Sequence, residues 1–447
     1  MAGQEQAEPS SSSAPLPFIS PTLPTTHDAA RPGSQAMELI YLDHASTTHL
    51  HPRVARAMEE VRAHPRGNPA SPHRRGREAR GLLEGARERI AGLLGRTPGE
   101  VFFVRGGTES DNLAIQGRVL AALEERAGGS RSRASPPVVA HSALEHSAVR
   151  ESAEAAARRF GVQVEILDVL PSGQVDGAQL DRLLTRTPEQ PLPVVSVQLV
   201  NGETGLVLGV AEVIRRCRER GVVVHVDAVQ GVGRVPFPWG EEGAGPPPHL
   251  LSFSAHKLGG PGGAGILVRE AGVPLAPLLV GGGQEGGVRP GTVDVEAATG
   301  TAEALALALE SMEGEARRLA ALRDGLQARI MEKMPDLRVH GGEGPRAPHI
   351  LNLGVPAVPR DLLPGAMDLE GVAVSAGSAC RSGATSVSPV LRALYGEAAQ
   401  KVAPLRISLG WSTTAGEVET AGARILQVLS RVRGVQGMPW RKFGGRT

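Results

Sequence analysis

Two polar residues, Asp227 and Lys257, have the types and surroundings needed to hold a reactive ring. Lys257 lies in LSFSAHKLGGPGG (251–263), after Ser254 and His256 and ahead of a run of glycines. Small side chains and bare backbone leave room for a ligand beside its amine. Asp227 ends an apolar, β-branched run, which is the pattern of a buried strand that finishes in a carboxylate. The amine could hold an aldehyde covalently, and the carboxylate could stabilise a cationic ring nitrogen.

Each of these residues alone has an ordinary structural explanation. An aspartate at a strand end is commonly a turn former or a helix cap, and a lysine in a glycine-rich loop is commonly solvated. Together the two suit pyridoxal phosphate, because this cofactor needs an amine for its aldehyde and an anion opposite its pyridinium nitrogen, which makes the ring an electron sink. Whether they meet depends on the elements that carry them.

A candidate phosphate-binding segment lies upstream of both residues. A buried strand predicted over 101–104 runs into RGGTESDN (105–112), and a helix is predicted over 113–123. Strand, glycines, hydroxyl and helix start together bind phosphate, because free N–H groups and the positive end of the helix dipole meet the anion. The same pattern also describes a capped helix entered through a glycine turn. The candidate phosphate ligands are Gly107 and Thr108.

The two cysteines of the chain have different surroundings. Cys380 lies in AGSACRSGATS (376–386), where glycines and serines flank it without a helix or strand pattern. This composition predicts an exposed, flexible loop whose thiol could act as a nucleophile. Cys217 lies on a predicted helix among arginines, whose charge could lower the pKa of its thiol, but it is far from every other motif and is interpreted as incidental. Two such distant cysteines argue against a disulfide framework and fit a reducing compartment.

Taken in order, these motifs resemble those of the aminotransferase class V family of pyridoxal phosphate enzymes, and specifically its cysteine desulfurases. The resemblance runs from about Tyr41 to about Gln427. GSAC followed by SG around Cys380, with its spacing to Leu391, resembles the long-loop subgroup, in which a mobile cysteine carries sulfur from substrate to acceptor. The resemblance implies a fold-type I α/β enzyme, with a large domain built on a mainly parallel seven-stranded sheet between helices and a smaller α/β C-terminal domain.

The resemblance also implies a role for each site residue. Lys257, Cys380 and His146 would be catalytic, and the ring of His146 would stack on the cofactor and move protons. Arg406, in PLRISLG (404–410), would bind the substrate α-carboxylate, which a planar guanidinium does bidentately. The implied cofactor-binding residues are Gly107, Thr108, His146, Asn201, Asp227, Gln230, Ser254, His256, Lys257 and Thr292.

Two of these assignments concern neighbouring groups. Thr292, at the end of GGGQEGGVRPGT (281–292), would touch the cofactor phosphate of a second subunit, so the resemblance implies a homodimer with shared active sites. Gln230 would contact the phenolic oxygen of the cofactor. The family has two asparagines nearby, the second on that same oxygen, whereas this sequence has Asn201 and then Gly202. Either Asn201 reaches in through an altered backbone, or Gln230 makes the contact alone.

The activity implied by the resemblance is cysteine desulfuration. L-Cysteine would become L-alanine, and its sulfur would pass as a Cys380 persulfide to an acceptor protein such as an iron–sulfur scaffold, or toward a thio-cofactor or tRNA. Three alternatives stay open: a selenocysteine lyase, another class V aminotransferase or lyase, and a catalytically silent scaffold that binds a sulfur acceptor. The sequence names neither the acceptor nor the preferred chalcogen.

Composition and charge exclude several other classes. The 447 residues are 41% hydrophobic and 21% charged, as in an ordinary soluble protein, and the net charge of +1 gives no electrostatic reason to bind nucleic acid or a membrane. The sequence has no apolar run near the roughly 18 residues of a membrane span. We find no secretory or mitochondrial signal, so a cytoplasmic location is expected.

The chain is predicted to divide into four parts. Residues 1–37 are rich in serine and proline and are expected to be a disordered extension. A large cofactor-binding domain is expected over 55–305, a smaller domain that carries the cysteine loop over 38–54 and 306–430, and a tail over 431–447. Translation could begin at Met1 or at Met37.

Overall fold

The computed structural model describes residues 38–63, 67–127, 135–185, 190–240, 245–377 and 387–434. The extension predicted to be disordered (1–37) and the predicted cysteine loop around Cys380 lie outside these ranges, so both stay predictions. The boundaries of the four predicted parts stay predictions as well. The last helix, α12 (Ala415–Gly434), extends into the first residues of the predicted tail.

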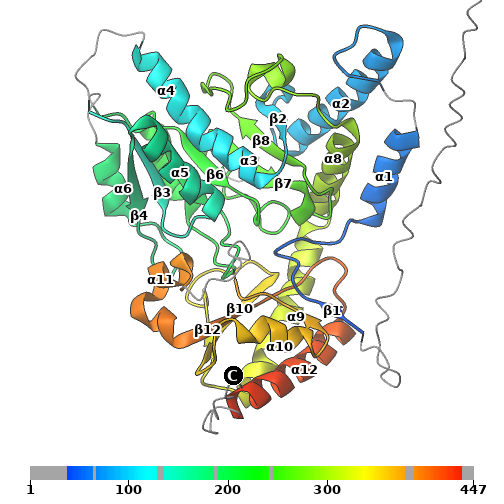
Figure 1. Cartoon of the computed structure of the whole chain (residues 1–447), viewed down its shortest axis with the longest axis vertical. Helices are drawn as coiled ribbons and strands as arrows, with labels where there is room; N and C mark the ends of the chain where they lie inside the picture. The colour runs from blue at the N-terminus through cyan, green and yellow to red at the C-terminus, as the bar shows by residue number, and fades with distance from the viewer. Residues whose placement is uncertain are drawn as a thin grey trace, which may run out of the picture. The chain divides into compact units, whose positions relative to one another are not determined.

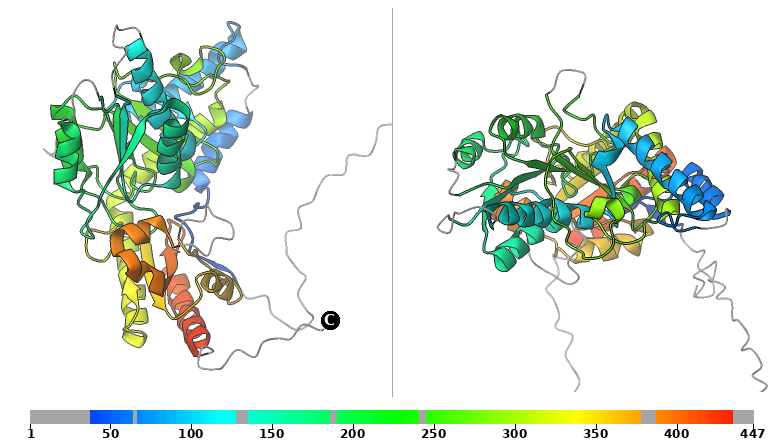
Figure 2. Two further views of the ribbon diagram at one scale, coloured as in Figure 1. Left: turned by 60° about the vertical axis from the view of Figure 1, so that its left-hand side comes forward. Right: turned by 90° about the horizontal axis from the view of Figure 1, so that it is seen from above.

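The largest sheet has the expected seven strands, which lie in the order β2-β8-β7-β6-β5-β3-β4 (Figure 1). Strand β8 is antiparallel to both neighbours, and every other adjacent pair is parallel. Helices lie on both faces of this sheet (Figure 2), which is why its central strands are almost entirely valine, leucine and other buried residues. The strands are β2 (Val101–Val104), β3 (Val138–Ser142), β4 (Gln163–Leu167), β5 (Val194–Gln198), β6 (Val224–Asp227), β7 (Leu250–Ser254) and β8 (Gly265–Arg269).

Most of the helices that pack around this sheet have local start and stop signals. Asp176 caps α6 and Asp294 caps α8 by accepting backbone N–H groups, and Gly161 ends α5 in the left-handed conformation, with φ of 69°. The helix predicted over 113–123 begins earlier, at Gly107, because Gly106 adopts φ of 112° and turns the chain directly into it. The helices are α1 (Pro52–Ala63), α2 (Arg74–Leu93), α3 (Gly107–Asn112), α4 (Arg118–Ala127), α5 (Ser147–Phe160), α6 (Gly177–Leu184), α7 (Val210–Glu219) and α8 (Val295–Glu310), with a π-helical turn (Leu113–Gly117) joining α3 to α4.

A second hydrophobic core gathers the C-terminal part of the chain around a small antiparallel sheet. Its strands lie in the order β12-β10-β9, with bounds Val402–Ser408, Ile350–Pro356 and Arg338–Val339. The N-terminal strand β1 (Ile40–Tyr41) joins this region by pairing with β11 (Val372–Ala373). Helices α9 (Met312–Lys333), α10 (Leu362–Asp368), α11 (Pro389–Tyr395) and α12 complete it. Within the described ranges, no helix has the length and apolar character to cross a bilayer.

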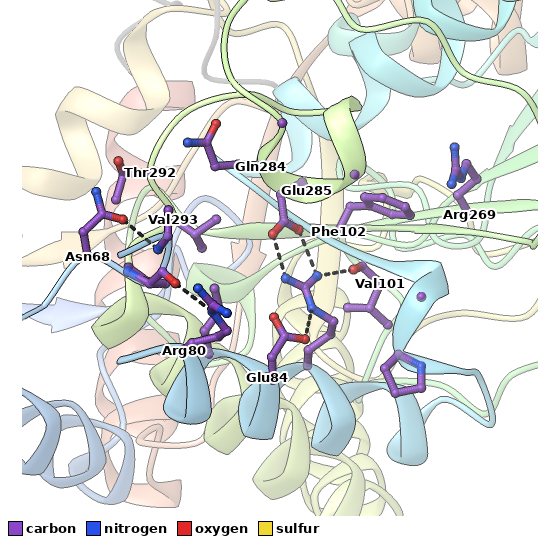
Figure 3. A pocket seen from close by; sticks show the side chains of 18 residues that line it. Asn68, Arg80, Glu84, Val101, Phe102, Arg269, Gln284, Glu285, Thr292 and Val293 are labelled. Atoms are coloured by element: carbon purple, nitrogen blue, oxygen red, sulfur yellow. Dashed lines mark hydrogen bonds and ion pairs between the residues drawn. The ribbon is translucent and has the colours of Figure 1, made fainter. Parts of the chain in front are cut away.

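A buried ion pair ties α2 to a short 3-10 helix (Gln284–Gly287). Two terminal nitrogens of Arg87 donate to the carboxylate of Glu285, at 2.7 and 2.9 Å, and one of them also donates to the Val101 carbonyl. Glu285 accepts the Phe103 N–H as well, at 2.8 Å. Figure 3 shows Glu285 and Val101 converging on this guanidinium. These contacts hold Glu285 in the left-handed region, at φ of 49°, which a residue with a side chain rarely adopts.

We expect Glu285→Ala to lower the free energy of unfolding by about 3 kcal/mol, because it removes the buried carboxylate from Arg87 and leaves this charge its ion pair with the half-exposed Glu84. Urea unfolding monitored by circular dichroism measures the change. Glu313→Ala is the matched control, since Glu313 pairs with Arg317 at the surface, and it should leave the unfolding free energy unchanged within error. A loss below about 1 kcal/mol at position 285 would show that the ion pair contributes little.

Candidate active site

One cavity of about 310 Å³ gathers nearly all the predicted site residues. It lies where β5, β6 and β7 end, which is where ligands bind in open α/β sheets, because the carboxyl ends of parallel strands and their loops meet there. Thr292 does not line it, and Cys380 lies outside the described residues. The predicted residues that do line it are Gly107, Thr108, His146, Asn201, Asp227, Gln230, Ser254, His256, Lys257 and Arg406.

Lys257 follows β7 in a single 3-10 turn, Ala255–Lys257. Its Nζ donates to the carbonyl oxygens of Ala45 and Ser46, both at 2.6 Å. Arg234 donates to the backbone carbonyl of Lys257 at 3.0 Å. The chain has four lysines. The lysines at 333 and 401 are exposed and the one at 442 is not among the described residues, so Lys257 is the described lysine that reaches a cavity.

Asp227 is the carboxylate at the end of β6, and it is 6% exposed. One of its oxygens accepts the Val229 N–H at 2.9 Å. Burial raises its pKa, and the nearby His146 and Lys257 act in the opposite direction. A cationic ring nitrogen in the cavity would favour the ionised form further. The residue present therefore fits the pyridinium nitrogen of pyridoxal phosphate.

His146 caps the N-terminus of α5. Its Nδ1 accepts the Ala148 N–H at 3.1 Å, and burial lowers its pKa, so the ring is neutral at pH 7 with its proton on Nε2. In this form His146 can donate a proton from Nε2. It can accept a proton on Nδ1 only if the hydrogen bond from the Ala148 N–H breaks. Its predicted role in moving protons is therefore that of a donor first.

The predicted phosphate ligands lie along one wall of the cavity. Gly107 begins α3, and a Cβ there would come within 2.7 Å of a Val229 methyl group, so the close approach requires glycine. Thr108 follows in the first turn, Ser254 ends β7, and His256 lies beside Lys257 with a pKa lowered by burial to about 4. Backbone N–H groups, two hydroxyls and a neutral imidazole at this wall can hold a phosphate.

Arg406, on β12, is 4% exposed, and its guanidinium is held by two separate chain segments. It donates to the Gly202 carbonyl at 2.9 Å, to Asp43 at 2.9 Å and to the Ser46 hydroxyl at 2.6 Å. Its Nε is buried without a hydrogen-bond partner among the described residues. Since buried donors are nearly always paired, this N–H is available for a ligand carboxylate.

The side chain of Asn201 lines the cavity but serves the backbone. Its amide nitrogen donates to the Leu144 carbonyl at 3.0 Å, and its oxygen accepts the N–H groups of Glu203 and Thr204 and the Thr204 hydroxyl. The residue thus forms a side-chain turn, and both polar atoms of its amide are anchored to neighbouring groups of the chain. This favours the second explanation for Gly202, in which Gln230 makes the phenolate contact alone.

Thr292 and Cys217 stand apart from the cavity. Thr292 is exposed and lies beside Val293 in the hollow drawn in Figure 3, so its predicted contact with a second subunit stays a prediction. Cys217 is fully buried on α7, and burial raises the pKa of its thiol to about 12 despite the neighbouring arginines. The suggestion that their charge lowers its pKa is therefore wrong, and the thiol is inert.

Two buried carboxyls beside the site received no role from the sequence. Glu145 is 1% exposed; one oxygen accepts the Gln198 N–H at 2.7 Å, and the other is without a hydrogen-bond partner in the described part of the chain. Asp111 is also 1% exposed, 3.7 Å from His225, and its pKa is raised by burial and then by Asp227. The sequence did contain a signal for these two carboxyls, because each is an acidic residue in a motif of otherwise small or apolar residues at a strand end.

Comparison with known proteins places these residues in a family context. Residues 40–420 match the model of the family described as aminotransferase class-V. The IscS-like cysteine desulfurase of Mycobacterium tuberculosis is 36% identical over 396 residues, which is 88% of this chain and 97% of the relative. The cysteine desulfurase IscS of Klebsiella pneumoniae is 36% identical over 409 residues, 90% of this chain and 96% of the relative.

Solved structures give the same result for the fold. A NifS-like protein superposes with a TM-score of 0.76 at 30% identity, covering 88% of this chain and all (100%) of the neighbour. DndA from Streptomyces lividans superposes with a TM-score of 0.63 at 34% identity, covering 82% of this chain and 99% of the neighbour. The expected fold-type I architecture is confirmed.

We expect the protonation of Glu145 to make stability depend on pH. Burial raises its pKa from about 4.5 to about 8. The folded state therefore keeps a proton that the unfolded state releases, so the contribution is complete below pH 4.5 and is lost as pH rises toward 8. Glu145→Gln removes this dependence. Between pH 5 and 8, the unfolding free energy of the wild type should fall by more than about 1 kcal/mol relative to the variant.

Urea unfolding of the cofactor-free protein at several pH values measures this difference. Glu88→Gln, at an exposed glutamate on α2, is the control for the chemical change. A difference between wild type and Glu145→Gln that does not vary with pH would show that Glu145 is ionised in the folded state.

Proposed function

The chain belongs to the aminotransferase class V family, and from this premise we propose that it is a pyridoxal-phosphate-dependent cysteine desulfurase. Relatives of that name match along nearly their whole length. The single observation that carries the proposal is that Asp227, Lys257 and Arg406 come from three different elements and line one cavity. Cofactor chemistry and amino-acid recognition therefore have their residues in one place.

The cavity residues divide the cofactor between them. When bound, pyridoxal phosphate stores the electrons released as bonds at the substrate α-carbon break. Asp227 would hold the ring nitrogen in its protonated form, and the amine of Lys257 would hold the aldehyde carbon. Gln230 would donate to the phenolic oxygen, and His146 would cover the ring face. The phosphate would lie against Gly107, Thr108, Ser254 and His256.

The remaining residues act on the substrate. Arg406, whose Nε has no hydrogen-bond partner in the described part of the chain, would orient L-cysteine by its carboxylate. Lys257, once exchanged for the substrate amine, is a free base beside the α-carbon and would take its proton. His146 would return a proton from Nε2. The sequence assigns the sulfur step to Cys380, whose thiolate would attack the substrate sulfur, leaving a persulfide on the enzyme and alanine as product.

We propose a cytoplasmic homodimer that completes each site with Thr292 of the partner subunit. The apolar run just before the 281–292 loop supports a second copy, since Leu279 is 53% and Val280 is 100% exposed. Exposed apolar clusters of this kind commonly mark interfaces. The proposed sulfur acceptor is a protein partner, such as an iron–sulfur scaffold, or a carrier toward thio-cofactor or tRNA synthesis.

Turnover of L-cysteine and, separately, L-selenocysteine tests the proposal. Purified protein should release alanine from cysteine, with sulfur recovered as persulfide or sulfide. Lys257→Ala should abolish alanine formation, because no other described lysine reaches the cavity. Cys380→Ala should abolish transfer of sulfur from cysteine. Alanine from cysteine with Cys380→Ala would contradict the assigned nucleophile, and turnover of selenocysteine alone would identify a selenocysteine lyase.

A further inference from the structure

The side chain of Gln230 is held between two groups that fix which way its amide points. Its nitrogen lies 2.7 Å from the carbonyl oxygen of Ala45, and its oxygen lies 3.2 Å from Nε2 of His349. A carbonyl oxygen only accepts hydrogen bonds, so the amide nitrogen must face Ala45. The amide oxygen of Gln230 must then face His349.

The state of His349 follows from this orientation and from its burial. His349 is 2% exposed at the start of β10, and burial, with Arg234, His44, Arg323 and Arg406 nearby, holds its pKa well below the usual value. The ring is therefore neutral and has one N–H. Because the oxygen of Gln230 can only accept, that N–H is on Nε2. Nδ1 is buried and has no hydrogen-bond partner within the described ranges.

The glycine that departs from the family pattern lies directly beside this amide. A Cβ built at Gly202 would lie 3.4 Å from Cγ and 3.6 Å from Nε2 of Gln230, which is ordinary contact. The position of the family's second asparagine is thus next to the nitrogen of Gln230. The amide of Asn201 is anchored at both polar atoms away from Gly202, so the second N–H of Gln230 is the amide donor assigned to this wall of the cavity.

We propose that His349 is a positioning residue for the cofactor. By donating from Nε2 to the oxygen of Gln230, it keeps the amide nitrogen toward the cavity, where it donates to the phenolic oxygen of pyridoxal phosphate. One oriented amide then replaces the pair of amides in the family pattern. Without His349 the hydrogen bond to Ala45 would hold the amide alone, the amide oxygen would lose its donor, and turning the amide over would cost less. The inference rests on the proposed function, since it requires pyridoxal phosphate in this cavity.

A matched pair of substitutions separates the hydrogen bond from the bulk of the ring. The amide of glutamine reaches the position of Nε2, whereas that of asparagine reaches only the position of Nδ1. His349→Gln therefore keeps a donor to Gln230 and His349→Asn loses it. His340→Gln is the control for changing a buried histidine, because His340 pairs with Asn352 and does not line the cavity. The measurement is the visible absorbance of the resting holoenzyme titrated with pH.

The direction of the expected shift follows from charge. Deprotonation of the bound cofactor increases the negative charge on its phenolic oxygen, so a donor to that oxygen lowers the midpoint pH of the absorbance change. His349→Asn should raise the midpoint by about one pH unit, the size expected for one hydrogen bond to a charged oxygen. His349→Gln and His340→Gln should titrate like the wild type. Gly202→Asn added to His349→Asn should return the midpoint toward the wild-type value.

Each other result has a definite meaning. A normal absorbance band in His349→Asn with an unshifted midpoint would show that His349 only fills space, and the inference would be wrong. An equal shift in His340→Gln would show a general effect of core substitution and would also overturn it. A wild-type protein with no cofactor band would instead refute the proposed function. If His349→Asn does not fold, Gln230→Leu alone should raise the midpoint in the same way, and an unshifted midpoint there would equally overturn the inference.

Discussion

The segment 43–46 is the structural link on which both halves of the site depend. Its carbonyl oxygens at Ala45 and Ser46 accept Lys257, and its Asp43 and Ser46 side chains accept Arg406. The Ala45 N–H is itself held by the hydroxyl of Ser408 on β12. One short segment near the start of the described chain therefore fixes the distance between the group that would hold the cofactor and the group that would hold the substrate. A shift of this segment would move both together.

Burial gives the cavity its chemical character. Glu145 and the ring of His146 are neutral at pH 7 because burial disfavours their charged forms. Asp227 would meet a cationic ring nitrogen, and Arg406, which also pairs with Asp43, would meet a carboxylate. The neutral donors at His349 and Gln230 then adjust the cofactor without adding charge.

The sequence was sufficient for the fold class and for most of the site, since Asp227 ends a strand, His146 and Lys257 each follow one, and parallel strands end at one edge. It could not reveal that Asn201 is used by its own turn, because that depends on backbone geometry after β5. Nor could it reveal the contact of His349 with Gln230, which joins two turns 119 positions apart, one after β6 and one before β10. The helix start at Gly107 was missed because glycine usually disfavours helices, and here the adjacent strand and turn outweigh that preference.

The central claim is that Lys257 holds the cofactor, and covalent trapping tests it most directly. Borohydride reduction of the holoenzyme fixes pyridoxal phosphate onto the amine that carries it, and peptide mass spectrometry identifies that amine. With four lysines in the chain, the assignment is unambiguous. The structure predicts one labelled peptide, containing Lys257, and no label in Lys257→Ala. Label on Lys333, Lys401 or Lys442, or none at all in a protein with full cofactor absorbance, would contradict the account.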